Sequence, residues 1–301
     1  MTIPEWANGT AGPRQPGAPR THRVDLPGRG TTRVWDCAGP PGAPTLMLIH
    51  GVAGTAELNW ARVFAPLSRH FRVVAADLRG HGDGIRLRSR FRLEDCADDF
   101  AALAGVLGTG RVTAVGYSMG GLIAQLLYRR HTPLISGLVL CSTARGVRGS
   151  RAEELAARAV PVVAAALRWN PIMYQVSAEA FGMALLGDIG DPVTARWVRA
   201  QLRRTTLATA ISALPAVSAF SSHGWIGQVD VPTAVVVTTR DSTVLPARQL
   251  ELARAIPGAS VYEVPAGHGA CVSAPQLFAP ALLKACRAVT SEHGRKVRAP
   301  A

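Results

Sequence analysis

The chain has 301 residues, 48% of them hydrophobic, and a formal net charge of +13 at pH 7. This composition is sufficient for one large buried core, so it excludes a chain that is disordered throughout. Only 6% of the residues are aromatic, and the positive charge is almost entirely arginine spread along the chain. Because nucleic-acid binding usually interleaves basic residues with stacking aromatics, no nucleic-acid partner is expected.

The chain ends and the cysteines favour a reducing, cytoplasmic location. Residues 1–21 are rich in proline and glycine and lack the apolar run of a signal peptide, so they predict a disordered lead-in. The five cysteines are odd in number and form no C-x-x-C pair, which argues against a disulfide framework or a zinc site. No apolar run reaches about 18 residues, so we expect a soluble protein, with peripheral contact to an anionic membrane surface left open.

The first half of the chain alternates strand and helix patterns. Residues 22–27 and 31–37 flank a glycine turn and predict an antiparallel hairpin at a sheet edge. From Pro44 onward, apolar runs alternate with amphipathic segments. These runs are apolar throughout, which is typical of parallel strands buried on both faces. The expected strands are 45–49, 72–76, 112–116 and 135–142, and the expected helices are 58–71, 93–107 and 119–130.

The pattern is interrupted at residues 145–225, which are rich in Ala, Arg and Leu and predict a separate helical layer. It then resumes with strands at 232–239 and 260–265, and helices at 246–256 and 274–289. The sequence therefore predicts a doubly wound α/β fold with a mostly parallel sheet. Its core comprises residues 22–144 and 226–290, a helical cap is inserted at 145–225 between the sixth and seventh strands, and 291–301 form a basic, frayed tail.

One serine stands at the sharpest predicted turn. In the stretch "AVGYSMGGLI", Ser118 follows a buried strand and precedes a helix. Side chains two positions before and after a serine at so tight a strand-to-helix turn would collide, which explains Gly116 and Gly120. Gly121 extends this elbow. The Ser118 hydroxyl would then stand at the carboxyl ends of the strands, where open α/β sheets bind ligands.

A serine hydroxyl needs a base, and the base needs a partner that fixes its tautomer. Asp241 and His268 each follow a predicted strand by a few residues, so both would lie at the same sheet edge as Ser118. The oxyanion formed in acyl transfer needs backbone donors. We assign the N–H groups of Met119 and Val52, with Ala53 as the less favoured alternative to Val52.

The chain resembles the α/β-hydrolase fold superfamily, and in particular a serine esterase or lipase-like member with a helical cap. The motifs "HGVAG" at 50–54, "DLRGHG" at 77–82, "GYSMGG" at 116–121 and "GH" at 267–268, with Asp241, carry the resemblance over residues 44–289. It implies a nucleophile, base and acid at Ser118, His268 and Asp241. It also implies an oxyanion hole at Val52 and Met119, and no cofactor or metal.

Other positions of these motifs concern the shape of the loops. His50 and Gly51 are interpreted as residues that order their loop. Two positions depart from the pattern of many relatives: Gly84 stands where they have serine, and Ser273 where they have an acidic residue. These departures predict that the two loops are held differently in this chain.

The expected reaction is hydrolysis of a carboxylic ester with an apolar or lipid-like acyl group, because the cap carries apolar stretches at 160–167, 171–174 and 180–187. Cofactor-free perhydrolysis, cleavage of a carbon–carbon bond, and a non-enzymatic ligand-binding receptor remain as alternatives. A further hypothesis places an arginine-rich rim beside the site, where it would attract an anionic lipid or an acidic substrate. The arginines concerned are Arg86, Arg88, Arg90, Arg92, Arg145, Arg148 and Arg151.

Overall fold

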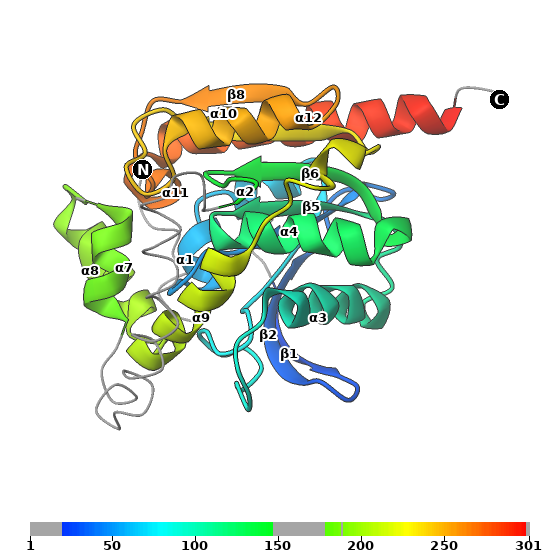
Figure 1. Ribbon diagram of the computed structural model, residues 1–301. Helices are drawn as coiled ribbons and strands as arrows, with labels where there is room; N and C mark the ends of the chain where they lie inside the picture. The colour runs from blue at the N-terminus through cyan, green and yellow to red at the C-terminus, as the bar shows by residue number, and fades with distance from the viewer. Residues whose placement is uncertain (1–19, 147–177, 188, 299–301) are drawn as a thin grey trace.

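The central feature of the computed structural model is an eight-stranded sheet in the order β1-β2-β4-β3-β5-β6-β7-β8 (Figure 1). The structure describes residues 20–146, 178–187 and 189–298. The first three strands in this order pair antiparallel and the others pair parallel. The strands are β1 (Arg20–Leu26), β2 (Gly30–Cys37), β3 (Thr45–Ile49), β4 (Arg72–Ala76), β5 (Val112–Tyr117), β6 (Ile135–Cys141), β7 (Thr233–Thr238) and β8 (Ser260–Val264). The predicted fold class is confirmed.

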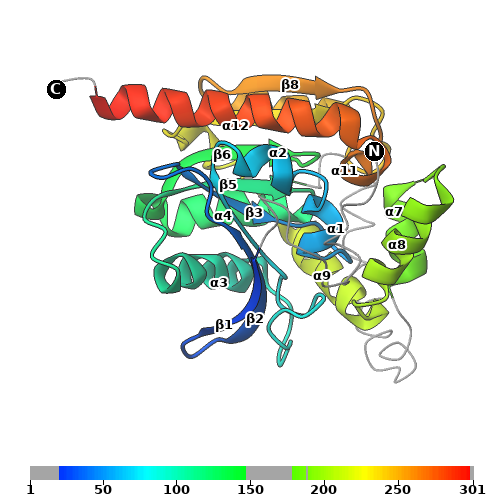
Figure 2. The same cartoon turned by 180° about the vertical axis from the view of Figure 1, so that it is seen from behind.

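Helices cover both faces of the sheet, as the two opposite views show (Figures 1 and 2). α3 (Leu93–Val106), α4 (Met119–Arg130) and α10 (Pro246–Ala255) cover one face. α1 (Ala56–Trp60), α2 (Phe64–Ser68) and α12 (Pro275–Arg298) cover the other. The short α11 (Ala270–Ser273) precedes α12. No described helix combines the length and the apolar character that crossing a membrane requires.

The strands are apolar throughout because successive side chains enter two different cores. In β3, Leu46 and Leu48 pack with α1 and α12, whereas Met47 and Ile49 pack with α3 and α4. All five residues of β3 are buried. Side chains alternate between the two faces of a strand, so a strand covered on both sides needs an apolar residue at every position.

Two expected elements differ from the structure. The segment 58–71 is not one helix but the separate α1 and α2, because Pro66 has no N–H to donate to the carbonyl of Arg62 and its ring would clash there. At the other end, α12 extends to Arg298, past the helix end expected at residue 289. The expected tail, residues 291–301, is therefore helical up to Arg298. Of the expected lead-in, residues 1–21, residues 1–19 lie outside the described residues, whereas Arg20 and Thr21 belong to β1 and are not disordered.

The two ends of the segment inserted between β6 and β7 lie next to each other and are hydrogen-bonded. Gly146 forms an antiparallel bridge with Ser221, and the Ser222 N–H donates to Arg145 O at 2.8 Å. Its described helices are α7 (Glu179–Leu186), α8 (Pro192–Leu202) and α9 (Leu207–Ala219) (Figures 1 and 2). α8 packs against α1, and α7 packs against α11. Residues 147–177, with the apolar stretches 160–167 and 171–174, lie outside the described residues.

Arg204, which follows α8, ties this insertion to the sheet loops. Its guanidinium contacts Asp83 at 2.5 Å and Glu57 at 3.4 Å. Burial raises the pKa of Glu57, and the positive charge of Arg204 opposes that rise. The insertion is therefore held to the core by a partly buried ionic contact as well as by apolar packing.

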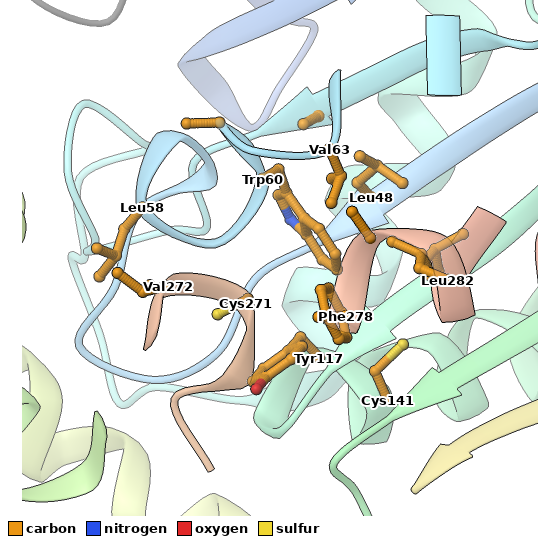
Figure 3. Packing of buried hydrophobic residues seen from close by; sticks show 14 of the residues in the cluster. Leu48, Leu58, Trp60, Val63, Tyr117, Cys141, Cys271, Val272, Phe278 and Leu282 are labelled. Atoms are coloured by element: carbon orange, nitrogen blue, oxygen red, sulfur yellow. The ribbon is translucent and has the colours of Figure 1, made fainter. Parts of the chain in front are cut away.

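The core beneath α12 is built around aromatic rings (Figure 3). Tyr117 packs edge-on against Phe278, with ring centroids 5.5 Å apart, and against Trp60 at 6.1 Å. Edge-to-face pairs of this kind add to the stabilisation from burial. Tyr117 is the residue before Ser118, so this core also fixes the end of β5.

Replacing Phe278 by alanine is expected to lower the free energy of unfolding by about 3–5 kcal/mol, because Phe278 is 0% exposed and its removal leaves a cavity. Urea denaturation followed by circular dichroism would measure this. The matched control is its neighbour Leu277, which is 41% exposed, so Leu277→Ala should change stability by less than about 0.5 kcal/mol. Equal losses in both variants would contradict the described packing.

Candidate active site

Ser118 sits at the strained turn between β5 and α4. Its φ is 54° and its ψ is −121°, a left-handed region that residues other than glycine rarely occupy. Its N–H donates to Cys141 O at 2.9 Å, so the ladder between β5 and β6 holds the turn. Its side chain makes no capping hydrogen bond to α4, which leaves the hydroxyl available for another partner.

The glycines of the elbow allow three backbone segments to approach closely. A Cβ on Gly116 would lie 2.3 Å from Gly120 O, and a Cβ on Gly120 would lie 2.1 Å from Ile49 O. A Cβ on Gly121 would lie 2.4 Å from the Thr143 side chain. The predicted collision between the positions two before and two after the serine is therefore present, and β3 adds a further constraint on Gly120.

The structure brings Ser118, His268 and Asp241 together. His268 Nε2 lies 3.0 Å from Ser118 Oγ, and His268 Nδ1 lies 2.8 Å from Asp241 Oδ2. An ionised carboxylate can only accept hydrogen bonds, so Nδ1 carries the proton and donates to Asp241. Nε2 is then free to accept the Ser118 proton. The arrangement can convert the Ser118 hydroxyl into a nucleophile.

Asp241 is a buried carboxylate surrounded by donors. Its Oδ1 accepts the N–H groups of Thr243 and Val244, both at 2.8 Å. Its Oδ2 accepts from Thr238 Oγ1 at 2.8 Å and Gln249 Nε2 at 3.2 Å, besides His268. Burial alone would raise the pKa of Asp241, but His268 and the other donors hold it below its usual value. Asp241 is therefore ionised beside His268.

Val52 and Met119, whose backbone amides are assigned to the oxyanion hole, both line the cavity that opens at Ser118. Within the described residues, neither amide donates to a backbone or side-chain acceptor. Met119 is the first residue of α4, where amides lack partners inside the helix and the helix dipole favours negative charge. The two amides could stabilise an oxyanion bound to Ser118. Ala53, the alternative, has a φ of 61° and is fully buried.

His50 and Gly51 lie in the loop after β3. His50 Nε2 accepts the Leu78 N–H at 2.9 Å, and its Nδ1 lies 2.7 Å from Gly51 O, to which it donates. Burial and the neighbouring His81 lower the pKa of His50 to about 3. His50 is thus a neutral ring that joins two loops. The Gly51 N–H donates to Asn59 Oδ1 at 3.0 Å.

The two departures from the family pattern have different consequences. A Cβ on Gly84 would lie 2.1 Å from Leu78 O, so this loop has no space for a serine. Ser273 Oγ instead donates to Gly269 O at 3.0 Å within the turn that follows His268. Of these positions, only Gly84 is required by a close backbone approach.

A cavity of about 420 Å³ opens at Ser118 and His268. Most of its lining is apolar and comes from α4, α7, α9 and the loop before α10. The apolar side chains are Val52, Met119, Leu122, Ala144, Phe181, Leu185, Leu214, Val217, Val244 and Leu245. A cavity of this size and character fits a small apolar ligand.

None of the five described arginines of the hypothetical rim lines this cavity. The loop arginines Arg86, Arg88, Arg90 and Arg92 are exposed, and neither they nor Arg145 line the described cavity wall. Arg148 and Arg151 lie outside the described residues. The arginine that lines the cavity is Arg248 of α10, which the sequence analysis did not single out.

The sequence analysis also missed Thr238 and Gln249, which contact Asp241. The sequence does contain one indication of the role of Gln249, which is its position on the buried face of a helix. It shares the inward face of its helix with Leu252 and Ala253, where an apolar residue is the usual choice. Among the described residues, no group of three or more His, Cys, Asp or Glu side chains could hold a metal ion.

Comparisons with known proteins show the family to which the fold belongs. A family model described as alpha/beta hydrolase fold matches residues 44–275. An uncharacterized protein of Mycobacterium tuberculosis is 35% identical over 113 residues, which cover 38% of this chain and 32% of that protein. The chain thus matches about a third of that relative's length.

Two further proteins resemble most of the chain. A putative carbamate hydrolase of Agrobacterium fabrum is 26% identical over 247 residues, covering 80% of this chain and 92% of that protein. The crystal structure of an enol-lactonase from Burkholderia xenovorans has a TM-score of 0.69 and 25% identity, covering 88% of this chain and 100% of that chain.

Gly120→Ala is expected to lower the free energy of unfolding by about 1–3 kcal/mol or more, because its Cβ would overlap the backbone of β3. Thermal and urea denaturation would measure the loss. The matched control is Gly105 in α3, whose Cβ would meet no atom within 4 Å, so Gly105→Ala should be neutral or stabilising by up to about 1 kcal/mol. A Gly120→Ala variant as stable as the control would rule out the close approach.

Proposed function

This chain belongs to the alpha/beta hydrolase fold family, and on that premise we propose that it is a serine hydrolase that cleaves carboxylic esters. The observation that carries the proposal is the hydrogen-bonded series from Ser118 Oγ through His268 to the buried Asp241, placed at the mouth of an apolar cavity. In this proposal Ser118 is the nucleophile, His268 the base and Asp241 the acid.

The first half of the reaction forms an acyl-enzyme. His268 Nε2 takes the Ser118 proton as Oγ attacks the ester carbonyl carbon. Asp241 stabilises the imidazolium that forms, and the amides of Val52 and Met119 donate to the oxyanion of the tetrahedral intermediate. His268 then gives its proton to the leaving alcohol, and the carbonyl re-forms on Ser118.

The second half repeats these steps with water. His268 removes a proton from a water molecule, which attacks the acyl carbon from the position that the alcohol has left. The second tetrahedral intermediate uses the same two amides. It collapses when His268 returns the proton to Ser118 Oγ, which releases the carboxylic acid.

The cavity lining supports an apolar acyl group as part of the substrate. Leu122, Phe181 and Leu214 come from three different helices and face the same space. The putative carbamate hydrolase and the enol-lactonase act, by their names, on other compounds with a carbonyl carbon. Their chemistry is consistent with attack at a carbonyl in this chain, and we favour an ester as the substrate.

Ser118→Ala is expected to lower kcat/KM for 4-nitrophenyl esters by about 10⁴-fold or more, because the attacking oxygen is removed. Initial rates with acyl chains of increasing length would measure this, and a fluorophosphonate probe should label the wild type but not the variant. Ser212→Ala, which keeps the elbow intact, serves as the control and should be labelled normally. Labelling of Ser118→Ala, or no turnover by the wild type, would favour the receptor hypothesis.

Leu214→Trp is expected to move the preferred acyl length to shorter chains, because a larger side chain on α9 would fill part of the cavity. The ratio of kcat/KM values for long and short esters measures the change. Leu277→Trp, at an exposed position of α12, should leave that ratio unchanged. An unaltered ratio in Leu214→Trp would mean that the acyl chain lies elsewhere.

A further inference from the structure

Two buried polar side chains other than His268 donate hydrogen bonds to the Asp241 carboxylate. Thr238 ends β7 and Gln249 lies in α10, and both are 0% exposed. Thr238 Oγ1 lies 2.8 Å and Gln249 Nε2 3.2 Å from Asp241 Oδ2, the same oxygen that accepts from His268. Thr238 Oγ1 and Gln249 Nε2 are also 3.0 Å apart. These three groups form one network with the carboxylate.

The surrounding backbone determines which way the Gln249 amide points. The Thr238 N–H is a donor and lies 3.0 Å from Oε1, whereas the Val244 carbonyl is an acceptor and lies 2.7 Å from Nε2. A flipped amide would face each of these groups with the wrong atom. The NH₂ group therefore points at Asp241, and its second hydrogen lies between Asp241 Oδ2 and Thr238 Oγ1.

The direction of the Thr238 hydroxyl follows from the same reasoning. Because the Asp241 carboxylate only accepts, the Thr238 O–H donates to it at 2.8 Å. Thr238 Oγ1 can then accept from Gln249, and it also lies 3.1 Å from Ser142 Oγ. The Thr238 hydroxyl hydrogen therefore points at Asp241 Oδ2, and the contacts of Gln249 with the Thr238 N–H and the Val244 carbonyl orient its amide hydrogen toward the same oxygen.

We propose that Thr238 and Gln249 are positioning residues that keep Asp241 ionised and directed at His268. This inference rests on the proposed function, because it assigns a role relative to the triad. Neither residue lines the cavity, so neither has a contact to substrate. Their effect reaches the reaction through the carboxylate alone.

The role has a consequence for pH dependence. A hydrogen-bond donor stabilises the charged form of a carboxylate, so losing one makes Asp241 more basic. The pair of Asp241 and His268 then takes up a proton at higher pH. On the acidic side of the pH profile, which we call the acid limb, kcat/KM therefore begins to fall at a higher pH. Tyr117 of β5 is an ionisable neighbour, because its ring lies 5.9 Å from that of His268. Arg248 of α10 is a charged residue that lines the same cavity as His268. Neither changes in the variants below.

The test compares the pH profiles of kcat/KM for Thr238→Val and Thr238→Ser, using a 4-nitrophenyl ester. Valine keeps the shape of threonine but removes the donor, whereas serine retains the hydroxyl. Thr238→Val is expected to lower kcat/KM by about 10- to 100-fold and to move the acid limb upward by about one pH unit. In Thr238→Ser, the acid limb of the pH profile should lie at the same pH as in the wild type.

Gln249→Leu should move the acid limb in the same direction. Its matched control is Gln125 of α4, which is also 0% exposed. Gln125 Nε2 donates to Gly121 O and Ala144 O, and its Oε1 accepts from Ser222, so it has no contact with Asp241. Gln125→Leu removes an equally buried amide, and it should lower the melting temperature similarly while leaving the acid limb in place.

Each outcome decides a different claim. If Thr238→Val and Gln249→Leu lose activity without a shift of the acid limb, the pair has only a structural role and the inference is wrong. The same holds if Gln125→Leu shifts the limb as much as Gln249→Leu. If Ser118→Ala retains turnover, the proposed function fails instead, whatever the pH profiles show.

Discussion

The close contact between the first turn of α4 and the end of β3 determines the position of Ser118. Gly120 lies so near Ile49 O that a Cβ there would be 2.1 Å away, and a Cβ on Gly116 would be 2.3 Å from Gly120 O. This contact brings the start of α4 beside Ser118 and the loop that contains Val52. In the proposed reaction, the Met119 amide at the helix start and the Val52 amide would donate to the oxyanion on Ser118.

The second constraint is the charge of Asp241, which must be ionised although it is only 3% exposed. A buried carboxylate without partners would take up a proton. Here the donors come from the end of β7, the following loop, α10 and His268. Because no single element supplies them all, the ionised state depends on the packing of α10 against the sheet.

The inserted helices complete the site from the other side. Leu186 O of α7 lies so close to Gly269, the residue after His268, that a Cβ there would be 2.2 Å away. α7 and α9 also supply part of the cavity wall, and Arg204 links the insertion to Glu57 and Asp83. A change in how the insertion packs would therefore alter both the cavity and the loop that carries His268.

The sequence by itself determined most of the succession of strands and helices along the chain, because strands buried on both faces are apolar at every position. The glycines around Ser118 also marked the turn between β5 and α4. It also predicted that Ser118, Asp241 and His268 meet, since parallel strands bring their carboxyl ends to one edge. Only the tertiary structure decided which partners Asp241 has and what shape the cavity takes. Nothing in the sequence marks Thr238, and the inward position of Gln249 on its helix does not reveal what it contacts. Both become partners of Asp241 through the packing of α10 on β7, which a linear pattern does not specify.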